Sequence, residues 1–389
     1  MPSSRRWLTL GVYSLVVALS QLLWLNFAPL LSMIQSRYGV SELLASALVL
    51  VFPALYVVFS LPAGALVDAR GYRFTVGAGA ALMAAAACVR IFDGSFWTLF
   101  AGQLGIAVAQ PFIVNGISKL VSDWFRDDEG AIATGLGTMG MFLGMAAGMA
   151  ATPALVAAVG LRATMAIFAA ISIAVAIVFV AVVHPNSARV ADDAATSDAA
   201  PARLGGAPLV TLFVLAFLGL GVFNGLTTWL EGILAPHGFD AERAGLVGGA
   251  LIVAGIAGAV VIPALSDRAR RRRPFLILCA AMALATIHPL CTSDRAAVVF
   301  IAAALHGFFF MPAFALLLEM CAQLSGLANA GRATSILMMA GNAGGVVVIV
   351  AMPLVKGAAP DFHRAVLLLV ALLAATTALA LTAPETSRR

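Results

Sequence analysis

The sequence is built from twelve long hydrophobic runs separated by short polar or charged breaks. Each run has about 20 residues, the length of helix needed to cross roughly 30 Å of hydrocarbon. Hydrophobic residues make up 62% of the chain and charged residues 11%, more apolar surface than one soluble core can bury. Backbone polar groups in lipid must be satisfied within the segment, so every run is predicted to be an α-helix.

The distribution of basic residues predicts how these helices cross the membrane. With the N-terminus cytoplasmic, 16 of the 23 Lys and Arg residues lie on the inside and 7 on the outside. Lys and Arg are enriched on the cytoplasmic side, so both termini are expected there. Arg outnumbers Lys and Ala is abundant, which suggests a GC-rich bacterium. With the hydrophobic runs, this predicts a multi-pass protein of a bacterial inner (cytoplasmic) membrane. The expected helices are residues 8–33, 43–67, 74–91, 97–121, 131–155, 163–183, 208–234, 244–265, 275–289, 296–323, 333–355 and 365–382.

One long polar stretch divides the chain into two halves of six helices. Residues 184–207 have no apolar period and are expected to form a cytoplasmic linker between a bundle at 1–183 and a bundle at 208–389. The halves also echo each other, because the segment around Asp68 after the second run resembles the segment around Asp267 after the eighth.

The first of these segments resembles the loop signature G-x-x-x-D-x-x-G-R-[KR] of the major facilitator superfamily. Gly64, Asp68, Gly71 and Arg73 fit the signature, and Tyr72 departs from it. The resemblance implies two helical bundles that open alternately to each side, with substrate near the midplane. It also implies that Asp68, Arg70 and Arg73 act as a cytoplasmic gate, although the arginines alone could serve orientation.

Polar residues at membrane depth are the candidates for substrate binding, because they are costly in lipid. Those expected near the middle third are Trp24, Gln110, Asn224, His306 and Asn342, and Glu231 is expected near the outer mouth. No Lys or Arg is expected at the centre, which favours a neutral or cationic amphiphile that could rest on the face of Trp24. The alternatives are simple packing for Trp24 and a bond to a neighbouring helix for His306.

The chain also resembles the feline-leukaemia-virus subgroup C receptor-related family of choline and haem transporters. The resemblance rests on the stretches 103–110 with Trp124-Phe125, 251–258 leading to Asp267, and 307–309 with Glu319. It implies that Trp24 and Gln110 match a choline-binding Trp and Gln. By the same resemblance, Asn342 stands where the family has a glutamine, Asn224 stands where it has a tyrosine, and Glu231 lies near a position where it has an asparagine.

Glycine rows on three expected helices predict close helix packing. They are Gly140, Gly144 and Gly148; Gly248, Gly249, Gly255 and Gly258; and Gly341, Gly344 and Gly345. These rows are interpreted as seams where the two halves pack and slide.

These features favour a secondary active or facilitative transporter of a small organic solute, working by alternating access, with a choline-like cationic or amphipathic molecule as substrate. One alternative is a proton-coupled exporter of drugs or metabolites, with Glu231 and His306 as the proton-coupling candidates because His titrates near neutral pH. An alternative of another class is a membrane receptor or sensor that transports nothing. Phosphate-loop, nucleotide-fold and metal-ligand spacings are missing, so no enzyme activity, cofactor, metal or nucleic-acid partner is expected, and the protein is expected to be a monomer.

Overall fold

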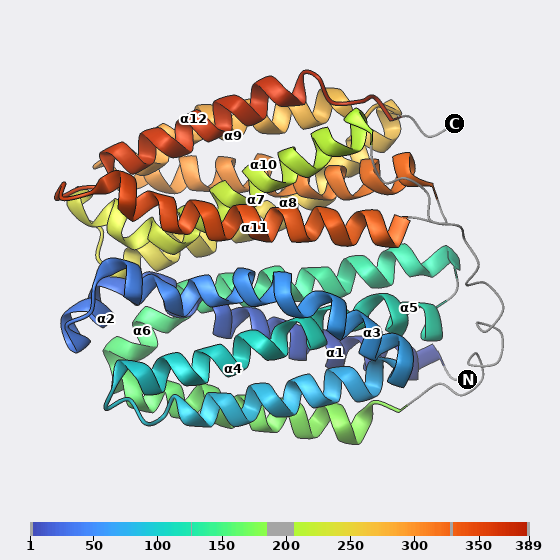
Figure 1. Ribbon diagram of the computed structural model, residues 1–389, viewed down its shortest axis with the longest axis horizontal. Coiled ribbons are helices and arrows are strands. Elements are labelled where there is room, and N and C mark those ends of the chain that lie inside the picture. Colours follow the sequence, from blue (N-terminus) through green and yellow to red (C-terminus); the bar gives the residue numbers. More distant parts are fainter. Residues whose placement is uncertain (1–2, 126, 185–205, 327–329, 387–389) are drawn as a thin grey trace. The chain divides into compact units, whose positions relative to one another are not determined.

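The computed structural model describes residues 3–125, 127–184, 206–326 and 330–386, and the described chain is helical (Figure 1). Ten of its helices are long and apolar enough to span a membrane. The predicted linker falls almost entirely outside the described residues. The helices are α1 (Ser3–Leu25), α2 (Leu31–Tyr38), α3 (Glu42–Val89), α4 (Phe96–Val114), α5 (Gly116–Trp124), α6 (Asp127–Val182), α7 (Ala207–Leu234), α8 (Ala241–Ala269), α9 (Arg273–Thr292), α10 (Ala296–Ser325), α11 (Ala330–Lys356) and α12 (His363–Ala380), with short 3₁₀ turns η1 (Ala28–Leu30) and η3 (Ala235–His237).

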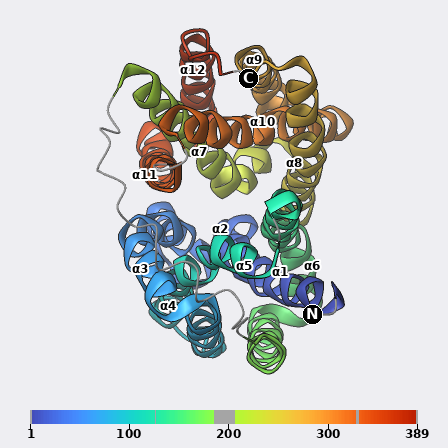
Figure 2. The ribbon, with the colours of Figure 1, turned by 90° about the vertical axis from the view of Figure 1, so that its right-hand side faces the viewer.

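The chain forms two compact units, each a bundle of helices lying side by side (Figures 1 and 2). Unit 1 comprises Met1–Phe27, Met33–Val40 and Ala47–Asp198, and unit 2 comprises Ala28–Ser32, Ser41–Ser46 and Ala199–Arg389. Two short segments from the first fifty residues therefore belong to unit 2, which a division at the linker does not anticipate.

Two of the helices are interrupted by a single glycine. α3 has 48 residues and α6 has 56, so unbroken helices would be about 72 Å and 84 Å long at 1.5 Å per residue. Gly71 in α3 has φ 77° and Gly160 in α6 has φ 82°. Residues with a Cβ atom rarely adopt this backbone conformation, so glycine allows the chain to break there. These breaks lie between the runs expected at 43–67 and 74–91 and between those at 131–155 and 163–183.

A row of glycines brings α1 and α6 into backbone contact within unit 1. A Cβ atom built on Gly140 would lie 2.9 Å from the Ser14 carbonyl oxygen, and one on Gly144 would lie 2.6 Å from the Ala18 carbonyl carbon. Real Cβ atoms do not approach this closely, so the two backbones meet because no side chain separates them. The predicted close approach along this row is confirmed.

Two glycine rows in unit 2 also bring helix backbones into contact. A Cβ atom at Gly344 of α11 would lie 2.7 Å from the Phe217 carbonyl carbon of α7. A Cβ atom at Gly258 of α8 would lie 2.6 Å from the Phe308 carbonyl carbon of α10. The interpretation of these rows as seams between the halves is wrong. Each row packs against a helix of its own unit.

The turn between α8 and α9 is held by a buried arginine. Arg272 is 2% exposed, and its guanidinium pairs with Asp267 and lies 2.5 Å from the Glu319 carboxylate of α10. Its Nη1 donates to Ser266 Oγ at 2.9 Å, and its backbone N–H donates to the Glu385 carboxylate at 2.7 Å. These bonds tie three helices together at one end of the unit, so this basic turn contributes packing as well as charge.

Candidate substrate and gate residues

Trp24 lies one residue before the end of α1 and is buried inside unit 1. Its indole Nε1 donates to the Val49 carbonyl at 3.2 Å, and its ring stacks on Phe52 with the centroids 6.1 Å apart. Trp24 is 9% exposed, so only a small part of the side chain is accessible. The hydrogen bond and the stacking hold the indole in one orientation.

Gln110 lies on α4, whose packing against α1 is fixed at two points. Tyr13 Oη donates to the Ile113 carbonyl at 3.1 Å, and Gln103 Nε2 donates to the Leu23 carbonyl at 3.0 Å. The two helices are thus antiparallel, and Gln110 lies about 10 Å along α4 from the Leu23 contact, at 1.5 Å per residue. Gln110 is 4% exposed, and its Nε2 has no hydrogen-bond partner among the described residues. A buried amide with free donors is a suitable group for a polar ligand.

Asn224 and Asn342 lie at the packing of α7 against α11 in unit 2. A Cβ at Gly345 would lie 3.0 Å from Asn224 Cγ, so the Asn224 side chain rests on the α11 backbone one turn from Asn342. Asn342 Nδ2 donates to the Met338 carbonyl at 2.9 Å. Asn224 Oδ1 is buried with no partner in the described part of the chain. The unit therefore brings these two predicted residues together and leaves an acceptor free.

His306 takes part in a contact between helices. Its Nδ1 lies 3.0 Å from Thr286 Oγ1 of α9, and Thr286 Oγ1 also donates to the Met282 carbonyl at 2.7 Å. Either group can donate in this bond, depending on the histidine tautomer, and in both cases the bond joins α10 to α9. The ring stacks on Phe310, which stacks on Phe223. This geometry matches the alternative in which His306 bonds to a neighbouring helix.

Glu231 lies near the end of α7 and is 8% exposed. Ser32, in a segment of unit 2 from early in the sequence, donates its hydroxyl to Glu231 Oε2 at 2.7 Å. No Lys, Arg or His of the described chain lies within ion-pair distance of this carboxylate. Glu42, which follows Ser32 by ten residues, pairs with Lys356 at the end of α11. A buried acid with a neutral partner can take up either a proton or a cation.

The three predicted gate residues have different surroundings in unit 1. Arg73 Nε donates to the Val183 carbonyl at 2.6 Å, just beyond the end of α6, and the Arg70 guanidinium lies 4.8 Å from the centroid of the Phe74 ring. Asp68 is exposed and makes no hydrogen bond or ion pair with any residue in the described ranges. Of the three, Asp68 is the one whose charge the unit does not use. Tyr72, which departs from the family signature, is buried and accepts a bond from Trp124.

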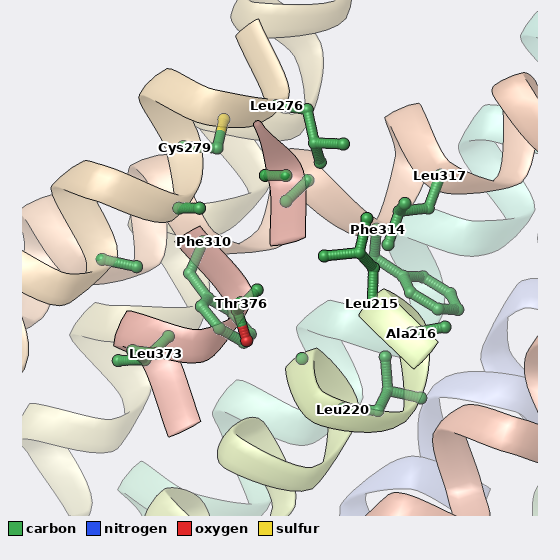
Figure 3. Close-up of a pocket in the computed structure, with 15 residues that line it drawn as sticks. Leu215, Ala216, Leu220, Leu276, Cys279, Phe310, Phe314, Leu317, Leu373 and Thr376 are labelled. Atoms are coloured by element: carbon green, nitrogen blue, oxygen red, sulfur yellow. The ribbon is translucent and has the colours of Figure 1, made fainter. Parts of the chain in front are cut away.

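An apolar pocket lies inside unit 2 between α7, α9, α10 and α12 (Figure 3). The space open to the centre of a water-sized molecule is about 40 Å³, and Phe310, Phe314, Leu317 and Leu373 line it among others. None of the described residues that line it is charged. A pocket this small and apolar does not suit a cationic solute, and its residues are not assigned to the substrate site.

Two polar groups of unit 1 that were not proposed as site residues make contacts inside the unit. Arg90, one of the seven basic residues expected on the outer side, is 0% exposed. Asn115 accepts from Tyr56 Oη at 2.9 Å and donates to the Ser60 carbonyl at 3.0 Å. The burial of Arg90 could have been suspected from the sequence, because Arg90 follows an Ala-rich run and has apolar residues within one helical turn on both sides. Among the described residues, no group of His, Cys, Asp and Glu could hold a metal ion.

Several curated proteins are similar to this chain. Solute carrier family 49 member A3 of Danio rerio is 28% identical over 71% of the chain and 62% of its own length. The choline/ethanolamine transporter FLVCR1 of Felis catus is 26% identical over 67% of the chain and 51% of its length. The choline/ethanolamine transporter flvcr2a of Danio rerio is 27% identical over 68% and 62%. The chain thus spans about half to two thirds of the length of these relatives.

A solved structure and a family model agree with this fold. A bacterial homologue of the human lysosomal transporter Spinster, in an inward-facing and occupied conformation, matches with a TM-score of 0.77 over 98% of the chain and 97% of that protein. The sequence identity is 14%, so this likeness concerns the fold alone. The Major Facilitator Superfamily model matches residues 13–349. Together with the two helical units and the apolar helices, this match shows that the chain is a membrane protein of the major facilitator superfamily.

Proposed function

We propose that the protein transports a small choline-like cation, a quaternary or primary amine with a short polar tail, by alternating access. The observation that carries this proposal is the fixed, nearly buried indole of Trp24 in unit 1, where Gln110 is a buried neutral amide whose Nε2 has no partner among the described residues. An aromatic face attracts a cation, and neutral amides can bond a hydroxyl or amine without adding charge. Similarity to choline/ethanolamine transporters supports the same substrate class.

The proposed substrate residues are those expected from the sequence. Trp24 and Gln110 would contact the cation and its polar tail, and Asn224 and Asn342 would supply further amide groups. Asn224 Oδ1 and Gln110 Nε2 both lack a partner in the described chain, so one acceptor and one donor are free. His306 is a weaker member, since its Nδ1 is already bonded.

We also propose a topology of twelve crossings with both termini cytoplasmic, in a bacterial inner membrane. The breaks at Gly71 and Gly160 divide α3 and α6 into two membrane-length pieces each, which raises the ten long helices to twelve. Domains at 1–183 and 208–389 joined by a linker at 184–207 follow from the same count. The excess of Lys and Arg in the loops assigned to the inside supports the orientation.

A ligand-stabilisation screen tests the substrate class. The purified protein would be heated with choline, ethanolamine, betaine and an anionic control such as succinate. A ligand present at 100 times its dissociation constant adds about 2.7 kcal/mol to the stability of the folded state. We expect choline or ethanolamine to raise the unfolding temperature and succinate to leave it unchanged. Stabilisation by succinate alone would contradict a cation site.

A second candidate is a proton-coupled exporter, and the specific observation that favours it is Glu231. This carboxylate is buried against a serine hydroxyl, with no basic partner in the described part of the chain. Such a group can alternate between protonated and charged forms as its surroundings open and close. His306 stays the second proton-coupling candidate.

Under this second candidate, Glu231→Gln should leave substrate exchange intact but abolish accumulation driven by a pH gradient. The amide keeps the shape and the bond to Ser32 but cannot carry a proton across. Flux in proteoliposomes with an imposed pH gradient measures both activities. Glu242→Gln, an exposed acid at the start of α8, is the matched control and should keep gradient-driven accumulation. Accumulation that survives in Glu231→Gln would remove Glu231 from the coupling mechanism.

We further propose that Asp68 is the residue of the cytoplasmic gate whose charge stabilises the inward-closed state. Asp68→Asn should increase the inward-open population about fivefold, which corresponds to about 1 kcal/mol for one lost polar interaction. The distance distribution between spin labels on Ser122 and Leu324, both exposed, would report the change. An unchanged distribution would show that Asp68 serves orientation or solubility instead.

A further inference from the structure

The end of α1 is held by two fully buried polar side chains, Arg90 and Gln103. Both are 0% exposed. Arg90 Nη1 donates to Gln103 Oε1 at 2.8 Å, and Gln103 Nε2 donates to the Leu23 carbonyl at 3.0 Å. Leu23 directly precedes Trp24. The hydrogen-bonded path therefore runs from the end of α3, through α4, to the backbone beside the proposed cation-binding indole.

The path ends at a helix terminus that needs a donor. α1 ends at Leu25, so the Leu23 carbonyl is among the last four of the helix, which have no N–H partner within it. Gln103 supplies that missing donor. The Arg90 guanidinium lies 5.6 Å from the Phe27 ring centroid, just beyond the helix end, where a positive charge complements the helix dipole.

The helix packing is shaped around the arginine. A Cβ atom at Gly102 would lie 2.5 Å from Arg90 Cγ and 2.7 Å from the Ala86 carbonyl oxygen, so α4 can approach because this residue has no side chain. No carboxylate of the described chain lies within ion-pair distance of Arg90, and its Nε and Nη2 have no hydrogen-bond partner there. Burying an unpaired cation costs several kcal/mol. A residue chosen for stability alone would be apolar at this position.

We propose that Arg90 and Gln103 are positioning residues that set the orientation of Trp24 for cation binding, an inference that rests on the proposed function. Gln103 fixes the backbone at Leu23, and Arg90 fixes Gln103. Val49 and Phe52 of α3 hold the indole itself, through its hydrogen bond and its stacking. The indole face is presented to the substrate only when both restraints act together.

A double-mutant cycle tests the proposal with choline and its uncharged carbon isostere, 3,3-dimethylbutan-1-ol. The preference for choline over the isostere measures the cation–aromatic attraction. Trp24→Leu and Arg90→Met are each expected to lower that preference about tenfold. The double variant should lose no more than either single one, because both changes remove the same interaction. Arg90→Lys, which keeps a charged donor, should retain most of the preference, as should the exposed control Arg162→Met.

Two results would overturn the proposal. One is independent effects, in which the losses of Trp24→Leu and Arg90→Met multiply. The other is a uniform weakening of both ligands by Arg90→Met, which a general structural role would produce. If Arg90→Met does not fold, Gln103→Glu breaks the same path, since it keeps an acceptor for Arg90 but removes the donor to Leu23. It is expected to lower the preference to the same extent.

An optical readout separates this proposal from the substrate assignment. The emission of Trp24 is obtained as the difference between each protein and its Trp24→Phe counterpart. We expect Arg90→Met to shift that difference spectrum to longer wavelength and to increase its quenching by acrylamide. If the wild type does not prefer choline, the proposed substrate is wrong, but the spectral change would still show that Arg90 positions Trp24. An unchanged difference spectrum would overturn the positioning role whatever the substrate is.

Discussion

Gly144→Ala is expected to destabilise the protein by about 3 kcal/mol, the upper part of the range for overpacked sites. The new methyl group would lie 2.6 Å from the carbonyl carbon and 2.7 Å from the Cα atom of Ala18, both backbone atoms of α1. No rotamer change can relieve that overlap, so α1 and α6 must separate. The separation also loosens the contacts at Gly140 and Gly148, one turn away on either side.

The same helix provides the control for this prediction. A Cβ atom at Gly135 would meet nothing within 4 Å, so Gly135→Ala should be neutral or stabilise α6 by about 0.5–1 kcal/mol through helix propensity. Thermal unfolding of both variants in the same detergent measures the difference. Equal unfolding temperatures for Gly144→Ala and Gly135→Ala would show that the contact between α1 and α6 is not close-packed.

Trp24→Ala should weaken choline binding by about tenfold or more, and Trp24→Phe by only a few-fold. The indole face attracts an ammonium group by up to about 2 kcal/mol once water is excluded, and about 1.4 kcal/mol corresponds to a factor of ten. Phenylalanine keeps an aromatic face with a weaker attraction. Isothermal titration of the purified variants measures both constants.

Trp97 supplies the matched control for that substitution. It lies in the first turn of α4 and is 63% exposed, so Trp97→Ala removes an indole that a buried solute cannot reach. Choline affinity should therefore be unchanged in Trp97→Ala. A Trp24→Ala variant that binds choline as well as Trp97→Ala does would place Trp24 among ordinary packing residues.

Much of the fold could be predicted from the sequence, because lipid leaves few choices to an apolar run of about 20 residues. The breaks near Gly71 and Gly160 were predicted as gaps between runs, and the close approach at Gly144 as part of a small-residue row. The partners of those rows were not predictable. Small residues at helical spacing show that a backbone can approach, but they do not say which helix approaches it.

The candidate site could be predicted less completely. The depth of a residue along its helix identified Asn224 and Asn342, and the structure places them at the contact between α7 and α11. Depth alone could not indicate that His306 bonds to Thr286, since a histidine at the same depth can face the substrate path or a neighbouring helix. The burial of Arg90 could not be predicted for a related reason. A cation at a predicted helix end is normally solvated, and only packing against Gly102 shows that this one is enclosed.

Choline flux into proteoliposomes is the measurement that tests the central claim most directly. Vesicles loaded with unlabelled choline and diluted into radiolabelled choline require no assumption about a coupling ion, and they separate a transporter from a receptor that only binds. We predict label uptake by the wild type above protein-free vesicles, competition by excess ethanolamine but not by succinate, and strongly reduced uptake by Trp24→Ala. Uptake no greater than in protein-free vesicles, from protein shown to bind choline, would contradict the account.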